Sequence, residues 1–251
     1  MSLTLLNTFF PVVLALIAAA YAAVGQAGAT GYIAAMGILG FAPDVIRPAA
    51  LALNTLVAMI GAARFARAGH LTWRGTYPFI VLGVPFSVLG GATHLPASIY
   101  NPVVGILLIV AAWRMAKSAR LAAGLDERAP RSPPLLPSII AGVIIGFVAG
   151  VTGIGGGIFI APLVLTLHWL NTRHAAGLSA IFNLLNSAAA LAGLWSTSLI
   201  WPPELPFWLV AVAIGGTLGS WLGVKHLPPN VLRYILAALL LVGGVWLLLI
   251  R

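Results

Sequence analysis

The chain has 251 residues, of which 61% are hydrophobic and 7% are charged; its mean hydropathy is +1.07 and its formal net charge is +9. Because a soluble domain carries about 25% charged residues, this composition excludes a soluble domain and predicts an integral membrane protein in a lipid bilayer. The positive charges are spread over the ends of apolar segments, so they do not indicate a nucleic-acid-binding protein. The sequence has no cysteine, which excludes disulfides and thiol-bound metals.

The uncharged stretches divide into ten apolar segments without the alternation typical of strands, which predicts helices. A helix needs about 20 residues to cross a bilayer, so the longest stretches hold two segments each. The predicted segments are 5–24, 26–41, 46–64, 77–93, 99–116, 137–152, 154–170, 174–197, 205–223 and 229–250. The predicted fold class is an all-α integral membrane protein. The first and second segments, and likewise the sixth and seventh, either cross fully or form re-entrant pairs.

Basic residues in the connections predict the orientation, because short loops rich in Lys and Arg stay in the cytoplasm. The basic connections follow the third and fifth segments and contain Arg64, Arg67, Arg74, Arg114, Lys117, Arg120, Arg128 and Arg131. Counting from them places both termini outside, in a multi-pass protein of the inner (cytoplasmic) membrane. The first segment lacks a basic leader and a convincing cleavage site, so we expect a retained helix.

A hydrophilic connection at 117–136 divides the membrane segments into two sets of five. It is expected to be a cytoplasmic linker between a first repeat at 1–116 and a second at 137–251. Because five is odd, the repeats are predicted to be inverted relative to one another. Aligning Gly25 with Gly153, and "RPAALAL" with "RHAAGLS", supports the duplication. Inverted repeats with interrupted segments are typical of transporters that bind substrate near the bilayer midplane.

The stretch "VTGIGGGIFIAPL" at 151–163 places four glycines within five positions of an apolar run. A dinucleotide-binding loop is disfavoured, because no βαβ unit or acidic ribose partner is visible, and no P-loop sequence for ATP occurs. A break in a helix would free backbone N–H groups, and the next helix would present the positive end of its dipole to an anion. "GQAGATG" at 25–31 predicts a corresponding break in the first repeat. Close helix packing is the alternative role for these glycines.

Polar side chains within apolar segments tend to face the interior of the bundle. Asn183 and Asn186 are three residues apart and are expected to share a helix face, from which amides can donate to the oxygens of an anion. Hydrogen bonding between helices is the alternative. Arg47 and Arg173 precede corresponding helices, where they either attract an anion or extend to the interface. The predicted substrate-binding residues are Gly25, Gln26, Gly28, Thr30, Asn54, Gly153, Gly155, Gly156, Gly157 and Asn186, with Arg47, Arg173, Ser179 and Asn183 as further candidates.

Three stretches carry a resemblance to a known family: "GVTGIGGGIFIAPLVL", "RPAALALNTLVAMIGAARFARAGHLTW" and "SAIFNLLNS". Through them nearly the whole chain resembles the TauE/SafE sulfite exporter family of bacterial membrane proteins. The resemblance implies a transporter that moves small sulfur-containing or organic anions, such as sulfite, sulfoacetate or another sulfonate, outward across the cytoplasmic membrane. The first break departs from the more usual glycine-rich form at Gln26 and Thr30.

These observations predict a secondary transporter or uniporter of such anions that works by alternating access. An anion channel, or an accessory membrane subunit of a larger assembly, is the alternative, and no catalytic constellation favours an enzyme. No cofactor or metal site is predicted, because the five histidines lack the spacing of metal ligands. All four carboxylates are placed in loops or at helix ends, which favours electrogenic export driven by the anion gradient and membrane potential. The sequence leaves the oligomeric state open.

Overall fold

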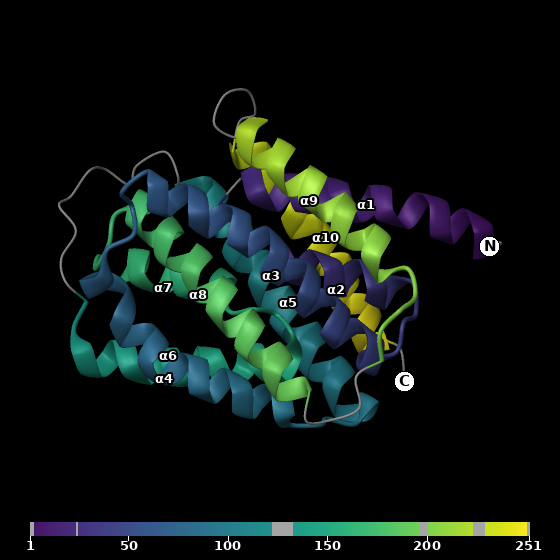
Figure 1. Cartoon of the computed structure of the whole chain (residues 1–251), viewed down its shortest axis with the longest axis horizontal. Helices are drawn as coiled ribbons and strands as arrows, with labels where there is room; N and C mark the ends of the chain where they lie inside the picture. Colours follow the sequence, from purple (N-terminus) through teal and green to yellow (C-terminus); the bar gives the residue numbers. More distant parts are fainter. Residues whose placement is uncertain (1–2, 24, 122–132, 196–199, 223–228, 250–251) are drawn as a thin grey trace.

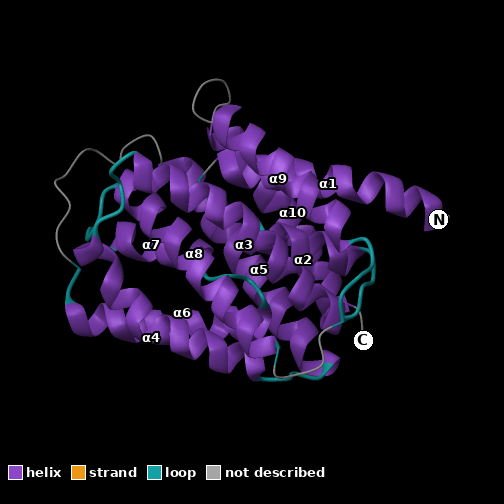
Figure 2. Ribbon diagram, viewed as in Figure 1, coloured by secondary structure: helices purple, strands orange, loops and turns teal. Residues whose placement is uncertain are grey.

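The computed structural model describes residues 3–23, 25–121, 133–195, 200–222 and 229–249, and these residues form ten helices and no strand (Figures 1 and 2). The prediction of an all-α protein is confirmed, and each helix overlaps one predicted segment. The helices are α1 (Leu3–Ala23), α2 (Ala29–Ile38), α3 (Pro43–Arg67), α4 (Trp73–Ala92), α5 (Ala97–Leu121), α6 (Leu135–Thr152), α7 (Gly157–Thr166), α8 (Thr172–Leu194), α9 (Leu205–Leu222) and α10 (Pro229–Leu249).

The outer surface of the helix bundle is apolar, as a protein embedded in lipid requires. Large hydrophobic side chains are exposed on several helices, among them Leu16 (66%), Leu136 (68%) and Phe207 (71%). Exposing such side chains to water would be unfavourable in proportion to their apolar area. Five of the described helices, α3, α4, α5, α6 and α8, are also long and apolar enough to cross a membrane. The chain is therefore a multi-pass membrane protein.

Helices α2 and α7 are too short to cross a bilayer. Each has 10 residues, which makes about 15 Å of helix against a hydrocarbon core of roughly 30 Å. The segments predicted at 26–41 and 154–170 were therefore too long. The reason is a residue with positive φ just beyond each helix, Gly40 at +77° and His168 at +54°, since such a residue closes the last helical turn.

Helix α7 turns back alongside α6. Helix α6 runs in the same direction as α4. A Cβ at Gly142 would meet the carbonyl of Phe79, and a Cβ four residues later, at Gly146, would meet the carbonyl of Gly83. Trp169, which follows α7, also contacts Phe79, with ring centroids 6.3 Å apart. The chain thus returns to the level of the first half of α6. The pair α6 and α7 has the form of the re-entrant alternative.

Glycines allow the backbones of α4 and α6 to touch. A Cβ at Gly150 would collide with the carbonyl oxygen of Ser87, and the contact of Gly146 with Gly83 is equally close. Helices α1 and α9 are joined in the same way, through Gly215 and the carbonyl of Ala15. Small residues at such positions let van der Waals packing hold membrane helices together. Packing is therefore the role of these glycines, which lie outside the two breaks.

The substitution Gly146→Ala should lower the thermal stability of the purified protein, because overpacking a close contact costs about 1–3 kcal/mol. Gly61→Ala is the matched control, since a Cβ there would meet only the Cβ of Ala180, at 3.9 Å. The measurement is the unfolding midpoint of both variants in detergent by scanning fluorimetry. Equal midpoints would contradict the close α4–α6 contact.

Candidate functional site

The two breaks predicted from the sequence are present, one before each short helix. Their glycines have positive φ, +79° and +99° at Gly25 and Gly28, and +82°, +78° and +82° at Gly153, Gly155 and Gly156. Side chains rarely adopt this conformation, which glycine adopts readily. Gly28 and Gly156 are the N-cap residues of α2 and α7. The glycines therefore turn the chain so that each short helix begins inside the bundle.

An asparagine from a long neighbouring helix caps each short helix. The backbone N–H of Ala29 donates to Asn54 Oδ1 of α3 at 2.9 Å, and that of Gly157 donates to Asn183 Oδ1 of α8 at 3.1 Å. Each amide oxygen lies at the positive end of a helix dipole, which also attracts the oxygen of an anion. Asn54 and Asn183 thus occupy corresponding places at the two breaks.

The polar side chains of α3 and α8 meet around the second break. Asn54 Nδ2 donates to Ser187 Oγ at 2.7 Å, and Ser179 Oγ donates to the carbonyl of Gly157 at 2.9 Å. A Cβ at Gly155 would lie 2.5 Å from both Asn54 Nδ2 and Asn183 Oδ1. Gly155 is therefore the break residue that faces this polar cluster. Ser187, which completes the cluster, was not among the predicted residues, although it ends the stretch "SAIFNLLNS".

Three predicted residues make other contacts. Gly156 faces apolar atoms, since a Cβ there would lie 2.9 Å from Phe182. The hydroxyl of Thr30 shares a hydrogen bond of 2.8 Å with that of Tyr21. Asn186 does not join Asn183 at the break: its Nδ2 donates to the carbonyl of Phe182 in its own helix, and its buried Oδ1 has no hydrogen-bond partner among the described residues. The two asparagines therefore make different contacts, although both lie on α8 three residues apart.

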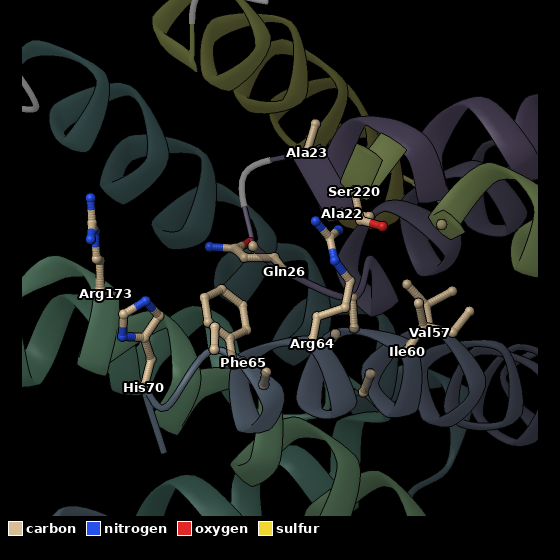
Figure 3. A pocket seen from close by; sticks show the side chains of 17 residues that line it. Ala22, Ala23, Gln26, Val57, Ile60, Arg64, Phe65, His70, Arg173 and Ser220 are labelled. Atoms are coloured by element: carbon tan, nitrogen blue, oxygen red, sulfur yellow. The ribbon is translucent and has the colours of Figure 1, made fainter. Parts of the chain in front are cut away.

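A cavity of about 450 Å³ reaches the first break from one end of the bundle (Figure 3). Gln26 of the break lines it, and so do Arg64, near the end of α3, and Arg173, near the start of α8. None of the described lining residues is acidic, so Arg64 and Arg173 give the described lining a net positive charge. The lining residues are Ala22, Ala23, Gly25, Gln26, Ala27, Val57, Ala58, Ile60, Gly61, Arg64, Phe65, Ala68, His70, Arg173, Ala180, Gly216 and Ser220.

The cavity unites two predicted residues, Gln26 and Arg173, with residues that the sequence analysis missed. Arg64 had been assigned only to a basic connection, yet its side chain is half-buried in the cavity wall. Figure 3 shows Gln26 between Arg64 and Arg173, with the ring of Phe65 beside it. Such positions follow from how α3, α8 and α9 pack together, so no local pattern indicated them.

Arg47 and Arg173 do not occupy corresponding places. Arg173 is exposed at the end of α8 that borders the cavity, whereas Arg47 is 3% exposed inside the first turns of α3 and does not line the cavity. Its guanidinium donates to backbone carbonyls of α4 and α6. Extension to the interface, one of the two roles considered for Arg47, is therefore wrong.

Comparison with known proteins gives consistent matches. The family described as Sulfite exporter TauE/SafE matches residues 9–247. The probable membrane transporter protein y4hK of Sinorhizobium fredii is 50% identical over 232 residues, which cover 92% of this chain and 94% of the relative. A probable membrane transporter protein of Methanocaldococcus jannaschii is 29% identical over 209 residues, which cover 78% and 75% of the two chains. No solved structure matches the chain significantly.

Proposed function

The chain belongs to the TauE/SafE family of membrane transporters, and on this premise we propose that it is a secondary transporter that exports small sulfur-containing or organic anions across the cytoplasmic membrane. Sulfite, sulfoacetate and other sulfonates are the proposed substrates. One observation carries the proposal: a cavity lined by Arg64 and Arg173 reaches the first break, where Asn54 caps the short helix α2. Helix N-termini and arginines are the groups with which proteins bind anions.

The cavity lining suits an anion that has a small organic part. Arg64 and Arg173 attract negative charge at the mouth, and the amide of Gln26 can donate to an oxygen of a sulfonate. Phe65 and Val57 form an apolar wall beside them. An acidic substrate with a short carbon chain would satisfy both surfaces, whereas a cation would be repelled.

We propose that residues 1–116 and 137–251 are inverted repeats joined by the linker at 117–136. The same sequence spacing separates Gly25 from Gly153, Gly28 from Gly156, and the positive-φ residues Gly40 and His168. One residue more separates the capping residues Asn54 and Asn183. In this second register Arg47 corresponds to Ala176 and not to Arg173. Superposition of the two halves in an experimental structure should require a rotation of about 180° around an axis in the membrane plane.

The proposed orientation places the mouth of the cavity in the cytoplasm. Arg64, Arg67 and Arg173 lie at this end of the bundle, in agreement with the preference of basic residues for the cytoplasmic side. The start of α1 and the end of α10 lie at the opposite end (Figure 1), which supports external termini. The basic linker residues at 122–131 fall outside the described residues. An anion would therefore enter the cavity from inside the cell, as export requires.

Transport by the purified protein in liposomes is the test of this function. Liposomes loaded with labelled sulfoacetate or sulfite should lose the anion faster than protein-free liposomes, and efflux should saturate with concentration. Excess unlabelled anion outside should accelerate exchange of the label, because alternating access permits counterflow. Efflux without saturation or counterflow would favour the channel alternative, and no efflux would favour an accessory subunit.

Export is expected to be electrogenic, because the described carboxylates offer no buried proton relay. Asp44 and Glu204 lie at helix ends, near the start of α3 and just before α9, and Asp126 and Glu127 fall outside the described residues. Each exported charge gains about 2.3 kcal/mol per 100 mV of inside-negative potential. A valinomycin-clamped, inside-negative potential should therefore accelerate sulfoacetate efflux. Efflux that ignores voltage but requires an opposing pH or Na⁺ gradient would contradict this mechanism.

A further inference from the structure

Arg47 is a buried cation, and its hydrogen bonds to the described residues all go to backbone carbonyls. Nη1 donates to the carbonyl of Thr93 at 3.1 Å, and Nη2 is within hydrogen-bond distance of the carbonyls of Gly90 (3.3 Å), Gly91 (3.2 Å) and Gly150 (3.2 Å). Its buried Nε has no hydrogen-bond partner among the described residues, and the guanidinium forms no ion pair with any described carboxylate. Asp44 attracts the guanidinium from three residues away but forms no ion pair with it, so burying this charge is costly and depends on the carbonyls that surround it.

These contacts join three helices. Arg47 belongs to α3, while Gly90 and Gly91 belong to the end of α4 and Gly150 to α6. Thr93 is the residue that follows α4. The carbonyls at the end of a helix carry the negative end of its dipole and attract a guanidinium. The bonds to α4 and α6 can all form only while these helices lie against the start of α3.

The region packed next to Arg47 corresponds, with the two halves of the chain exchanged, to the open cavity. In the register that pairs Asn54 with Asn183, the cavity residues Gly61, Phe65 and Ala180 correspond to Ala190, Leu194 and Leu51. These three counterparts form an apolar cluster in which each side chain is 5% exposed or less. Next to the cluster, a Cβ at Gly91 would collide with the carbonyl of Ala190. The protein is thus open at one end and sealed at the corresponding place of the other.

We infer that Arg47 is a latch that keeps this second end closed while the cavity is open. When α4 and α6 move away from α3, the guanidinium loses its carbonyl partners and the cluster of Leu51, Ala190 and Leu194 opens. The inference rests on the proposed transport by alternating access, which requires such a second opening. Arg47 acts here as a positioning residue that sets the balance between the two states.

Cysteine accessibility tests the latch, because the natural chain contains no cysteine. Ala190→Cys reports on the sealed end, and Gly61→Cys is the matched reporter in the open cavity. Each is placed in full-length protein with Arg47 intact or replaced by Gln, reconstituted in liposomes and treated with a membrane-impermeant methanethiosulfonate added to one side at a time. Arg47→Gln should accelerate modification of Ala190→Cys from the side opposite the cavity by about tenfold or more, the effect of losing one hydrogen bond to a charged group. Modification of Gly61→Cys from the cavity side should slow.

Two results would overturn the inference. One is an unchanged rate at Ala190→Cys in the Arg47→Gln protein. The other is faster modification at both positions, which indicates general loosening. Arg47→Lys, which keeps the charge but has fewer donors, should change both rates in the same directions by a smaller factor, and it replaces the Gln variant if that protein does not insert. The labelling rates need no transported substrate, so absent flux in the wild type would reject the proposed function without deciding the latch.

Discussion

Replacing Asn54 with Asp should reduce anion transport at neutral pH at least a hundredfold while the protein stays folded. The carboxylate can still accept the N–H of Ala29 and can accept a hydrogen bond from Ser187, so both contacts of Asn54 are retained. It also adds a negative charge beside the breaks, where two like charges about 4 Å apart repel by about 4 kcal/mol at an effective dielectric constant of 20. The measurement is sulfoacetate efflux per mole of protein, with the unfolding midpoint measured in parallel.

Asn171→Asp is the matched control for this prediction. Asn171 also caps a helix, because its side chain accepts the N–H of His174 at 3.0 Å, but it lies at the start of α8 and not at a break. Aspartate is a good N-cap residue, so this variant should transport at the wild-type rate. Wild-type transport by Asn54→Asp would mean that Asn54 only caps α2.

Reversing the charge at the cavity mouth with Arg64→Glu should raise the KM for sulfoacetate about tenfold or more. Arg64 lines the cavity, so a glutamate there would repel the entering anion. Arg67→Glu changes the net charge equally at the end of the same helix, but Arg67 is exposed and does not line the cavity. Its smaller effect should vanish at high salt, which screens exposed charges. Equal effects of the two substitutions would contradict entry through the cavity.

Hydropathy was sufficient to predict the helices, but their ends and contacts depend on other forces. The ten segments follow from the need of apolar side chains for lipid, and Gly25 and Gly153 mark the breaks because of their backbone freedom. The early end of α7 was missed because His168 is not a residue type expected at positive φ. Its equivalent Gly40 is the usual residue for that position, but the segment predicted at 26–41 ran past it as well.

The site was predicted in part, because side-chain partners depend on tertiary packing. The breaks and Asn54 were found as glycine clusters and intramembrane polar residues. Asn183 was ranked below Asn186, although Asn183 is the residue that caps a short helix. The two asparagines differ in which neighbouring helix each side chain meets, and the spacing of residues along α8 does not show this. Arg47 was paired with Arg173 because similar residues follow both in the sequence. The hydrogen bonds that cap the two short helices instead pair Asn54 with Asn183, and this register shifts the alignment.

The most direct test of the account is whether a transported anion occupies the cavity. Single-cysteine Gly61→Cys protein in liposomes is modified from the cavity side with and without saturating sulfoacetate, and transport of the same anion is measured on the same preparation. Position 61 lies in the cavity wall, so bound anion should slow the modification several-fold, and Asn54→Asp should abolish this protection. An unchanged rate of modification in protein that transports sulfoacetate would contradict the account.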